Sequence, residues 1–326
     1  MFAQVLTIVL PVFLLVGIGY ATARTGILSA AVGEALGQFV YVIAIPVLIF
    51  KTLAVVTLGD ASPWAMWLTY FGGVAVAWTS GTLLIRYLFA REARAGVIGG
   101  ISAGFANTVM VGIPLVSAVF GKPGLVPLIL LISVHLPVMT IVTAILMERA
   151  AAVDGMAEAR SPLAVTRTIL VSLAQNPIVI AILCSVVWRL TGLPLTGIFE
   201  DVLNRISSTS LPLALLSLGM SMVLYGIRGN LLPGVLLSLV KVALMPAVVL
   251  LLGLYVFSLP PLWVAVMTLT AACPTGVNAF IFANRYGTGH AMSANAITLT
   301  TAAAVLTCGL WVMVLDWLGL IPLASG

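Results

Sequence analysis

The chain has 326 residues, of which 62% are hydrophobic and only 7% are charged, and its mean hydropathy is +1.24. A soluble protein carries about 25% charged residues, whereas a helix needs about 20 apolar residues to cross a bilayer. The composition therefore excludes a soluble enzyme, a nucleic-acid-binding domain and a secreted disulfide-bonded domain. It indicates an all-α polytopic membrane protein whose net charge of +5 comes from dispersed basic residues. We expect the lipid bilayer as a partner, and no nucleic acid.

Ten apolar segments are predicted to be transmembrane helices. They cover residues 4–23, 35–56, 64–89, 96–121, 124–147, 166–190, 202–226, 231–256, 261–284 and 292–318. The first segment lacks the basic region that precedes the core of a signal peptide, so we interpret it as a membrane helix. The most polar stretch, 148–165, separates two halves of five segments each, 1–147 and 166–326. We predict that it is a cytoplasmic linker.

The basic residues predict the orientation. If both termini face outside, nine Lys or Arg residues lie on the cytoplasmic side and three on the outer side. Because cytoplasmic loops carry an excess of Lys and Arg, this arrangement is preferred. We expect a multi-pass protein of the inner (plasma) membrane with both termini outside.

The two halves resemble each other at an offset of 166–167 residues. The matched pairs are Pro11 with Pro177, Pro46 with Pro212, and Asn107 with Cys273–Pro274. Because each half has an odd number of segments, the second copy enters the membrane from the opposite side. This pattern predicts a 5+5 inverted repeat, which is typical of secondary transporters.

Helix-breaking residues occur in the fourth and ninth segments. Gly112 and Pro114 interrupt the fourth, and Pro274, Thr275 and Gly276 interrupt the ninth. Freed backbone groups at membrane depth must line a cavity or a protein interior, and half-helix N-termini attract anions. A matched pair of breaks therefore predicts a substrate site, although ordinary kinks are the alternative because Gly and Pro are common in membrane helices.

Four polar side chains within the apolar segments are candidates for this site. Asn107 and Asn278 lie beside the two breaks, where their amides can donate to a carboxylate while remaining neutral. His135 either hydrogen-bonds a neighbouring helix or titrates near the site. Lys241 needs a partner, which is either an anionic substrate or backbone carbonyls.

All nine acidic residues lie in loops or near segment ends. Carboxylate-based coupling is therefore disfavoured, while sodium coordination by backbone carbonyls stays open. We expect no cofactor and no metal site. The stretch Gly100-Ile-Ser-Ala-Gly104 fits a hydrolase nucleophile pattern, but it lies in an apolar helix with no acid beside it, so we do not expect an enzyme.

Two stretches resemble motifs of the auxin efflux carrier family. Residues 107–115 (NTVMVGIPL) are similar to its fourth-helix motif, and residues 274–286 (PTGVNAFIFANRY) to its ninth-helix motif. Asn176-Pro177 and Ser217-Leu-Gly219-Met also look like family features, and the short central linker is similar to the bacterial, malonate-transporter-like branch. Plant-type members differ in having prolines where this chain has Ala106 and Ala279.

The resemblance implies a ten-helix carrier in which helices 4 and 9 cross. It implies an elevator-like mechanism, with a scaffold of helices 1, 2, 6 and 7, often dimeric, and a moving unit of helices 3–5 and 8–10. We therefore predict a secondary carrier of a small organic mono- or dicarboxylate and a homodimer. A channel or membrane sensor of organic anions on the same fold is the alternative, and a membrane-embedded enzyme is disfavoured.

Overall fold

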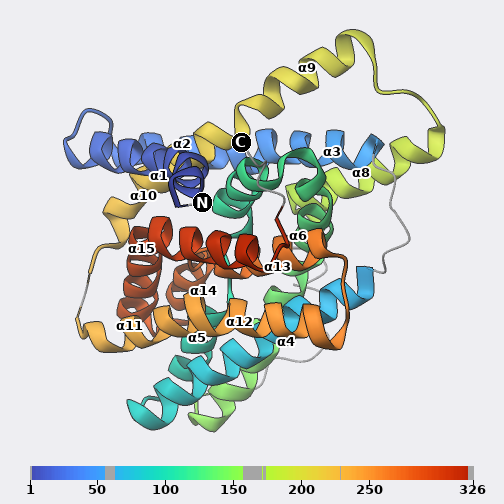
Figure 1. The fold of residues 1–326 in the computed structure, drawn as a ribbon. Helices are drawn as coiled ribbons and strands as arrows, with labels where there is room; N and C mark the ends of the chain where they lie inside the picture. The colour runs from blue at the N-terminus through green and yellow to red at the C-terminus, as the bar shows by residue number, and fades with distance from the viewer. Residues whose placement is uncertain (1, 56–62, 157–170, 172–173, 228, 322–326) are drawn as a thin grey trace.

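The computed structural model describes residues 2–55, 63–156, 171, 174–227 and 229–321, and these residues form helices joined by short connections (Figure 1). The helices are α1 (Phe2–Arg24), α2 (Ala30–Phe39), α3 (Ile45–Val55), α4 (Pro63–Leu83), α5 (Ala93–Gly104), α6 (Ile113–Val153), α8 (Pro177–Thr191), α9 (Gly197–Ser208), α10 (Ser210–Tyr225), α11 (Leu231–Leu239), α12 (Met245–Leu251), α13 (Pro261–Ala272), α14 (Asn278–Tyr286) and α15 (His290–Trp317). The π-helical turns are η1 (Val40–Ala44), η2 (Leu84–Leu88), η3 (Thr108–Gly112), η4 (Val240–Leu244) and η5 (Leu252–Val256).

Seven helical segments of the described chain are long and apolar enough to cross a membrane. One of them, Thr108–Val153, is broken by a kink at Gly121, at the boundary between the predicted fourth and fifth segments. Two further apolar helices, α8 and α13, are shorter. The predicted all-α class, with many membrane-length apolar segments, is confirmed.

Several predicted boundaries differ from the helices observed; for example, the seventh segment begins at Gly197, five residues before its predicted start at residue 202. The second segment begins at Ala30, five residues before its predicted start at residue 35. α6 continues to Val153, beyond the predicted end at residue 147, because Ala150–Ala152 are strong helix formers. The rest of the predicted linker, and the first part of the segment 166–190, lie largely outside the described residues.

The helices pack in two groups (Figure 1). The first helix group consists of α1–α3 and α8–α10, at the top of the view. Within it α1 packs along α10, where Gly19 faces the backbone of Leu216 and Gly219 faces the backbone of Val16. Glycine at both positions lets the two backbones approach closely, because any Cβ would collide with a carbonyl.

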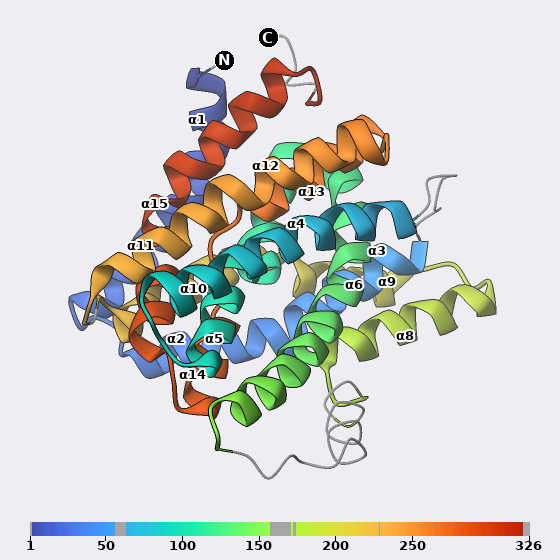
Figure 2. The ribbon, with the colours of Figure 1, turned by 90° about the horizontal axis from the view of Figure 1, so that it is seen from below.

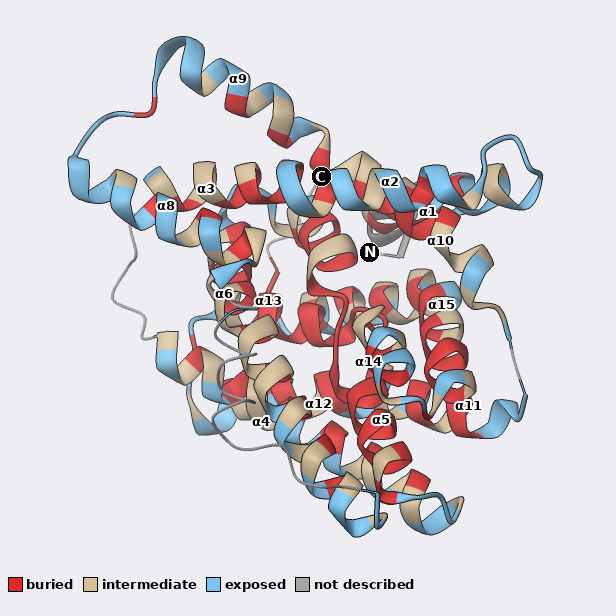
Figure 3. Ribbon diagram, turned by 180° about the vertical axis from the view of Figure 1, so that it is seen from behind, coloured by how far each residue is buried: buried red, intermediate tan, exposed pale blue. Residues whose placement is uncertain are grey.

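The second helix group consists of α4–α6 and α11–α15. α4 packs on α5, where Gly81 lies against the backbone of Gly99, and on the other side it packs on α12. The views in Figures 1 and 2 both show α4 and α12 side by side. Figure 3 shows that α5 and α13 are buried along most of their length, whereas α8 and α9 are largely exposed.

Two stretches of the second helix group share local geometry at an offset of 168 residues. Three pairs of elements have first residues that lie 168 positions apart: α4 with α11, η2 with η5, and α5 with α13. Positive φ angles match at the same offset, at Ala90 (49°) and Ser258 (45°), and at Gly121 (62°) and Gly289 (74°). Positive φ is uncommon for a residue other than glycine, so the match at Ala90 and Ser258 is specific.

Candidate functional site

The interruptions of two helices meet in the middle of the second helix group. One lies between α5 and η3, at residues 105–107, and the other lies between α13 and α14, at residues 273–277. Ala106 and Thr275 form an isolated antiparallel bridge. The Asn107 N–H donates to the Pro274 oxygen, and the Gly276 N–H donates to the Phe105 oxygen, both at 2.8 Å. Each extended segment thus satisfies backbone groups of the other, as non-helical backbone at membrane depth requires.

The first interruption does not lie where it was predicted. We predicted it at Gly112 and Pro114, but Gly112 belongs to η3 and Pro114 is the second residue of α6. η3 runs directly into α6 with helical backbone angles at Gly112, so Pro114 lies inside a helical run that begins with η3, and it does not end that run. The chain leaves the helix at Phe105 instead, and Asn107 starts the next turn by accepting a hydrogen bond from the Met110 N–H at Oδ1, at 3.1 Å.

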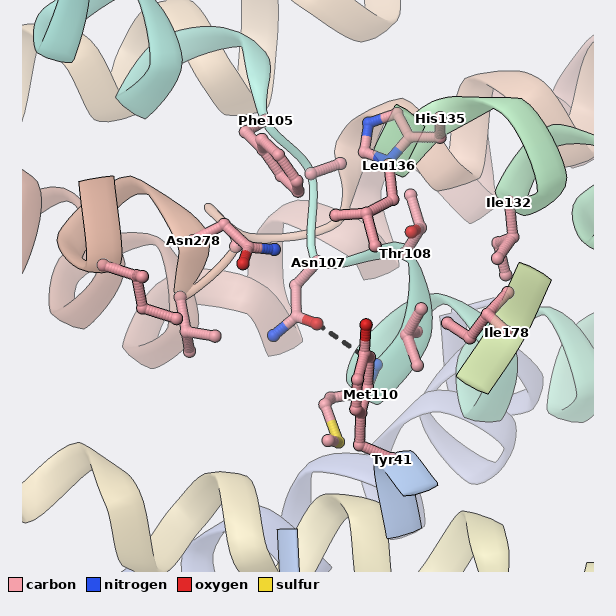
Figure 4. Close-up of a pocket in the computed structure, with 15 residues that line it drawn as sticks. Tyr41, Phe105, Asn107, Thr108, Met110, Ile132, His135, Leu136, Ile178 and Asn278 are labelled. Atoms are coloured by element: carbon pink, nitrogen blue, oxygen red, sulfur yellow. Dashed lines mark hydrogen bonds between the residues drawn. The ribbon is translucent and has the colours of Figure 1, made fainter. Parts of the chain in front are cut away.

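A cavity of about 390 Å³ opens beside the paired interruptions. Its wall is mainly apolar, and its polar side chains are Tyr41, Asn107, Thr108, His135 and Asn278. Figure 4 shows Asn107 and Asn278 as neighbours, with His135 and Tyr41 on opposite sides of them. An apolar cavity with a few convergent polar groups is the usual form of a small-molecule site.

The two asparagines come from the two interruptions. Asn107 is only 6% exposed, and its Nδ2 has no hydrogen-bond partner among the described residues. Asn278 is half-buried and begins α14. Because a buried amide without a partner loses about 1–3 kcal/mol, the Asn107 Nδ2 is best explained by a ligand or water that it binds.

Backbone donors of α14 also face this region. The first intrahelical donors of α14 are Ala279 and Phe280, which donate to the oxygens of Gly276 and Val277. Val277 and Asn278, whose N–H groups come before these donors, are among the residues that line the cavity. The N-terminus of a helix carries partial positive charge, so this wall favours an anionic group.

His135 lies in the cavity wall, inside an aromatic cluster. Its side chain is 1% exposed, and its Nε2 has no hydrogen-bond partner among the described residues. The ring lies 4.9 Å from Phe105, 5.6 Å from Tyr70 and 6.3 Å from Phe71, centroid to centroid. The contacts that hold His135 are therefore aromatic, and its ring borders the space that a ligand would fill.

Sequence analysis did not predict the part of the wall that the first helix group supplies. Tyr41 of η1 and Ile178 of α8 line the cavity. Asn176 donates to the Tyr41 Oη at 3.0 Å and accepts from the Ile178 N–H at 2.9 Å, so it caps α8 and positions Tyr41. Asn176-Pro177 was noted only as a family feature, and no sequence signal marked Tyr41.

Five of the predicted site residues do not line the cavity, and two of them are Gly112 in η3 and Pro114 in α6. Pro274 and Thr275 form the paired backbone, and the buried Thr275 Oγ1 donates to the Ser102 oxygen at 2.8 Å. Lys241 is fully buried, and its Nζ donates to the Ala271 oxygen. Of the two partners considered for Lys241, the structure therefore shows the backbone carbonyl. Among the described residues, no cluster of His, Cys, Asp or Glu could hold a metal ion.

Comparison with known proteins identifies the family. The model of the family "Membrane transport protein" matches residues 4–312. The chain belongs to this family. The match confirms the resemblance to the auxin efflux carriers, and it establishes a multi-pass membrane transporter.

Two known proteins are similar to this chain over nearly their whole length. A protein of Methanothermobacter thermautotrophicus named "Uncharacterized transporter" is 26% identical over 315 residues, which cover 94% of this chain and 97% of the relative. A protein of Rhizobium meliloti named "Putative malonate transporter" is 24% identical over 314 residues, which cover 94% of each chain.

Proposed function

We propose that this member of the Membrane transport protein family is a secondary carrier that moves a small organic carboxylate across the plasma membrane. The cavity beside the paired interruptions would bind the substrate. The observation that carries the proposal is the convergence of an unpartnered buried amide, Asn107, with the N-terminus of α14 on one apolar cavity.

The chemistry of the wall suits a small carboxylate. Among the described residues neither Lys nor Arg lines the cavity, so carboxylate oxygens would be bound by the Asn107 and Asn278 amides and by backbone N–H groups of α14. His135 Nε2 would offer a further polar contact. A volume of about 390 Å³ lies at the small end of ligand pockets. The name of the Rhizobium meliloti relative makes malonate the first compound to test.

The mechanism we propose is elevator-like alternating access. Ten transmembrane helices would form a 5+5 inverted repeat, in which helices 4 and 9 cross at the paired interruptions. The offset of 168 residues between matching turns supports this repeat. The scaffold would be helices 1, 2, 6 and 7, which correspond to the first helix group, and the moving unit would be helices 3–5 and 8–10.

The position of the cavity supports a movement of this kind. Tyr41 and Ile178 belong to the first helix group, whereas Asn107, His135 and Asn278 belong to the second. A shift of one group along the other would therefore remove part of the cavity wall and carry the asparagines with the substrate. We further propose that both termini lie outside the cell, and that the first helix group forms the contact of a homodimer.

Counterflow tests the carrier function. Purified protein in proteoliposomes preloaded with unlabelled malonate should transiently accumulate external labelled malonate, and the rate should saturate. A carrier gives this overshoot because one site is exposed alternately to the two sides of the membrane. A channel or a sensor gives no overshoot. Linear flux without an overshoot, for malonate and for other short mono- and dicarboxylates, would contradict the proposal.

A further inference from the structure

Lys241 is buried, and no carboxylate among the described residues pairs with it. It lies in η4, its side chain is fully buried, and its Nζ donates to the Ala271 oxygen. Within the described part of the chain the one ion pair is Arg94–Asp154, which does not involve Lys241. Because an uncompensated ammonium is costly inside a membrane protein, the groups around Lys241 must supply negative potential.

The last turn of α13 supplies that potential. α13 ends at Ala272, directly before the interruption, and Ala271 is its penultimate residue. The final carbonyls of a helix have no intrahelical donors and carry partial negative charge. The Cys308 Sγ lies 3.5 Å from the next oxygen, that of Ala272, so a second side-chain donor meets the end of this half-helix. In secondary transporters, half-helix C-termini of this kind coordinate the coupling cation.

The first interruption shows that a charged donor is not required for packing. α5 also ends at an interruption, but there the Ser102 oxygen accepts from a neutral hydroxyl, that of Thr275, at 2.8 Å. At the offset of 168 residues, the position of Lys241 corresponds to Gly73, which packs against Val249 of α12. Among the described residues, a lysine therefore donates at the helix end of the second interruption and a neutral hydroxyl at that of the first, and it is the second whose α14 contributes Asn278 to the cavity wall.

We infer that the Lys241 ammonium is a tethered cation, which occupies the place where the C-terminus of α13 would otherwise attract a metal cation. The inference rests on the proposed carrier function, and it adds a statement about ion coupling: substrate binding and transport need no sodium. Lys241 acts through the α13 C-terminus, so it is a positioning residue of the second interruption and not a substrate ligand.

Thermal unfolding without substrate tests this inference independently of transport. The wild-type midpoint should be equal in sodium chloride and in choline chloride at the same ionic strength. Lys241→Ala should unfold at a lower temperature in choline, and it should regain stability in sodium or in propylammonium, which replaces the deleted part of the side chain. Lys51→Ala is the matched control, since Lys51 donates to Asn204 and Ser207 at 2.7 and 3.3 Å. It should respond to neither cation.

Two results would overturn the inference. One is a wild-type midpoint, or a wild-type counterflow rate, that rises when sodium replaces choline. The other is a Lys241→Ala protein that neither cation stabilises. If Lys241→Ala is not obtained folded, Lys241→Gln tests the charge alone, because it keeps a hydrogen-bond donor and removes the charge: it should unfold at a lower temperature than wild type in choline, and a wild-type midpoint would also overturn the inference. Absent counterflow together with the expected unfolding pattern would refute the carrier function and leave the cation assignment intact.

Discussion

The interruption at residues 105–107 and the interruption at residues 273–277 share a backbone plan, but they differ in the side chains that complete it. In the first, Asn107 uses its Oδ1 to start η3, and the end of α5 meets a neutral hydroxyl. In the second, the side chain of Asn278 forms no cap on α14, and the end of α13 meets the Lys241 amine. Both asparagines line the cavity, but Asn107 also caps a helical turn, whereas Asn278 caps none.

The two asparagines are also not equivalent positions. At the offset of 168 residues, Asn107 corresponds to Thr275, and Asn278 corresponds to Met110. The cavity is therefore built from positions that differ between the two stretches. This difference teaches that the paired backbone segments can satisfy their own polar groups inside the membrane with mutual hydrogen bonds. The side chains available for binding then come from positions that do not match between the two stretches.

The largest expected difference in stability lies between Gly276, in the second interruption, and Gly112, in the π-helical turn η3 that follows the first. A Cβ on Gly276 would lie 3.0 Å from Phe105 Cδ1 and 3.3 Å from the Ala106 oxygen, inside the paired segments. On Gly112 the nearest atom would be 3.6 Å away. Gly276→Ala should lower the free energy of unfolding by about 1–3 kcal/mol. Gly112→Ala should raise it by about 0.5–1 kcal/mol, because alanine is the better helix former. Denaturant unfolding in mild detergent measures both, and equal effects would show that the interruptions are not packed as described.

A smaller and pH-dependent difference is expected at the starts of α5 and α13. Asp154 accepts from the N–H groups of Ala93 and Arg94, at 2.8 and 3.1 Å, and from the Arg94 Nε at 3.1 Å. α13 instead begins at Pro261, which has no N–H to offer. Partial burial alone would raise the pKa of the Asp154 carboxyl, but these hydrogen bonds outweigh it and hold the pKa below its usual value of 3.8.

A carboxyl whose pKa is lowered on folding stabilises the fold above the unfolded pKa, and this contribution is lost as the pH falls through the folded pKa. Asp154→Asn should therefore be less stable than wild type at pH 7, and the gap should close below pH 3.8. Unfolding midpoints across this range check it, with Asp316→Asn on α15 as a control. A gap that stays constant with pH would contradict the assignment.

Sequence reasoning reached the helical class and both interrupted regions because these follow from local composition. Of the predicted site residues, Asn107, His135, Gly276 and Asn278 line the cavity, and their part in substrate binding stays a prediction. The first break was predicted about seven residues too late, since Gly112 and Pro114 look like helix breakers although Asn107 starts the new turn before them. Tyr41 and Ile178 reach the cavity through packing between helix groups, and no periodicity encodes such a contact. The carbonyl partner of Lys241 is 30 residues away in sequence, so only the fold could identify it.

The most direct test of the account is calorimetric titration of malonate into the folded protein and its asparagine variants. Asn278→Ala should weaken binding by about 5- to 150-fold, equivalent to about 1–3 kcal/mol for one lost donor, and should leave the unfolding midpoint unchanged. Asn107→Ala should weaken binding similarly and also lose about 1 kcal/mol of stability, because it removes the cap on Met110. Asn230→Ala is the matched control: it removes the cap on Leu232 outside this cavity, so it should lower stability and leave affinity intact. Wild-type affinity in both Asn107→Ala and Asn278→Ala would contradict the binding site proposed between the two interruptions.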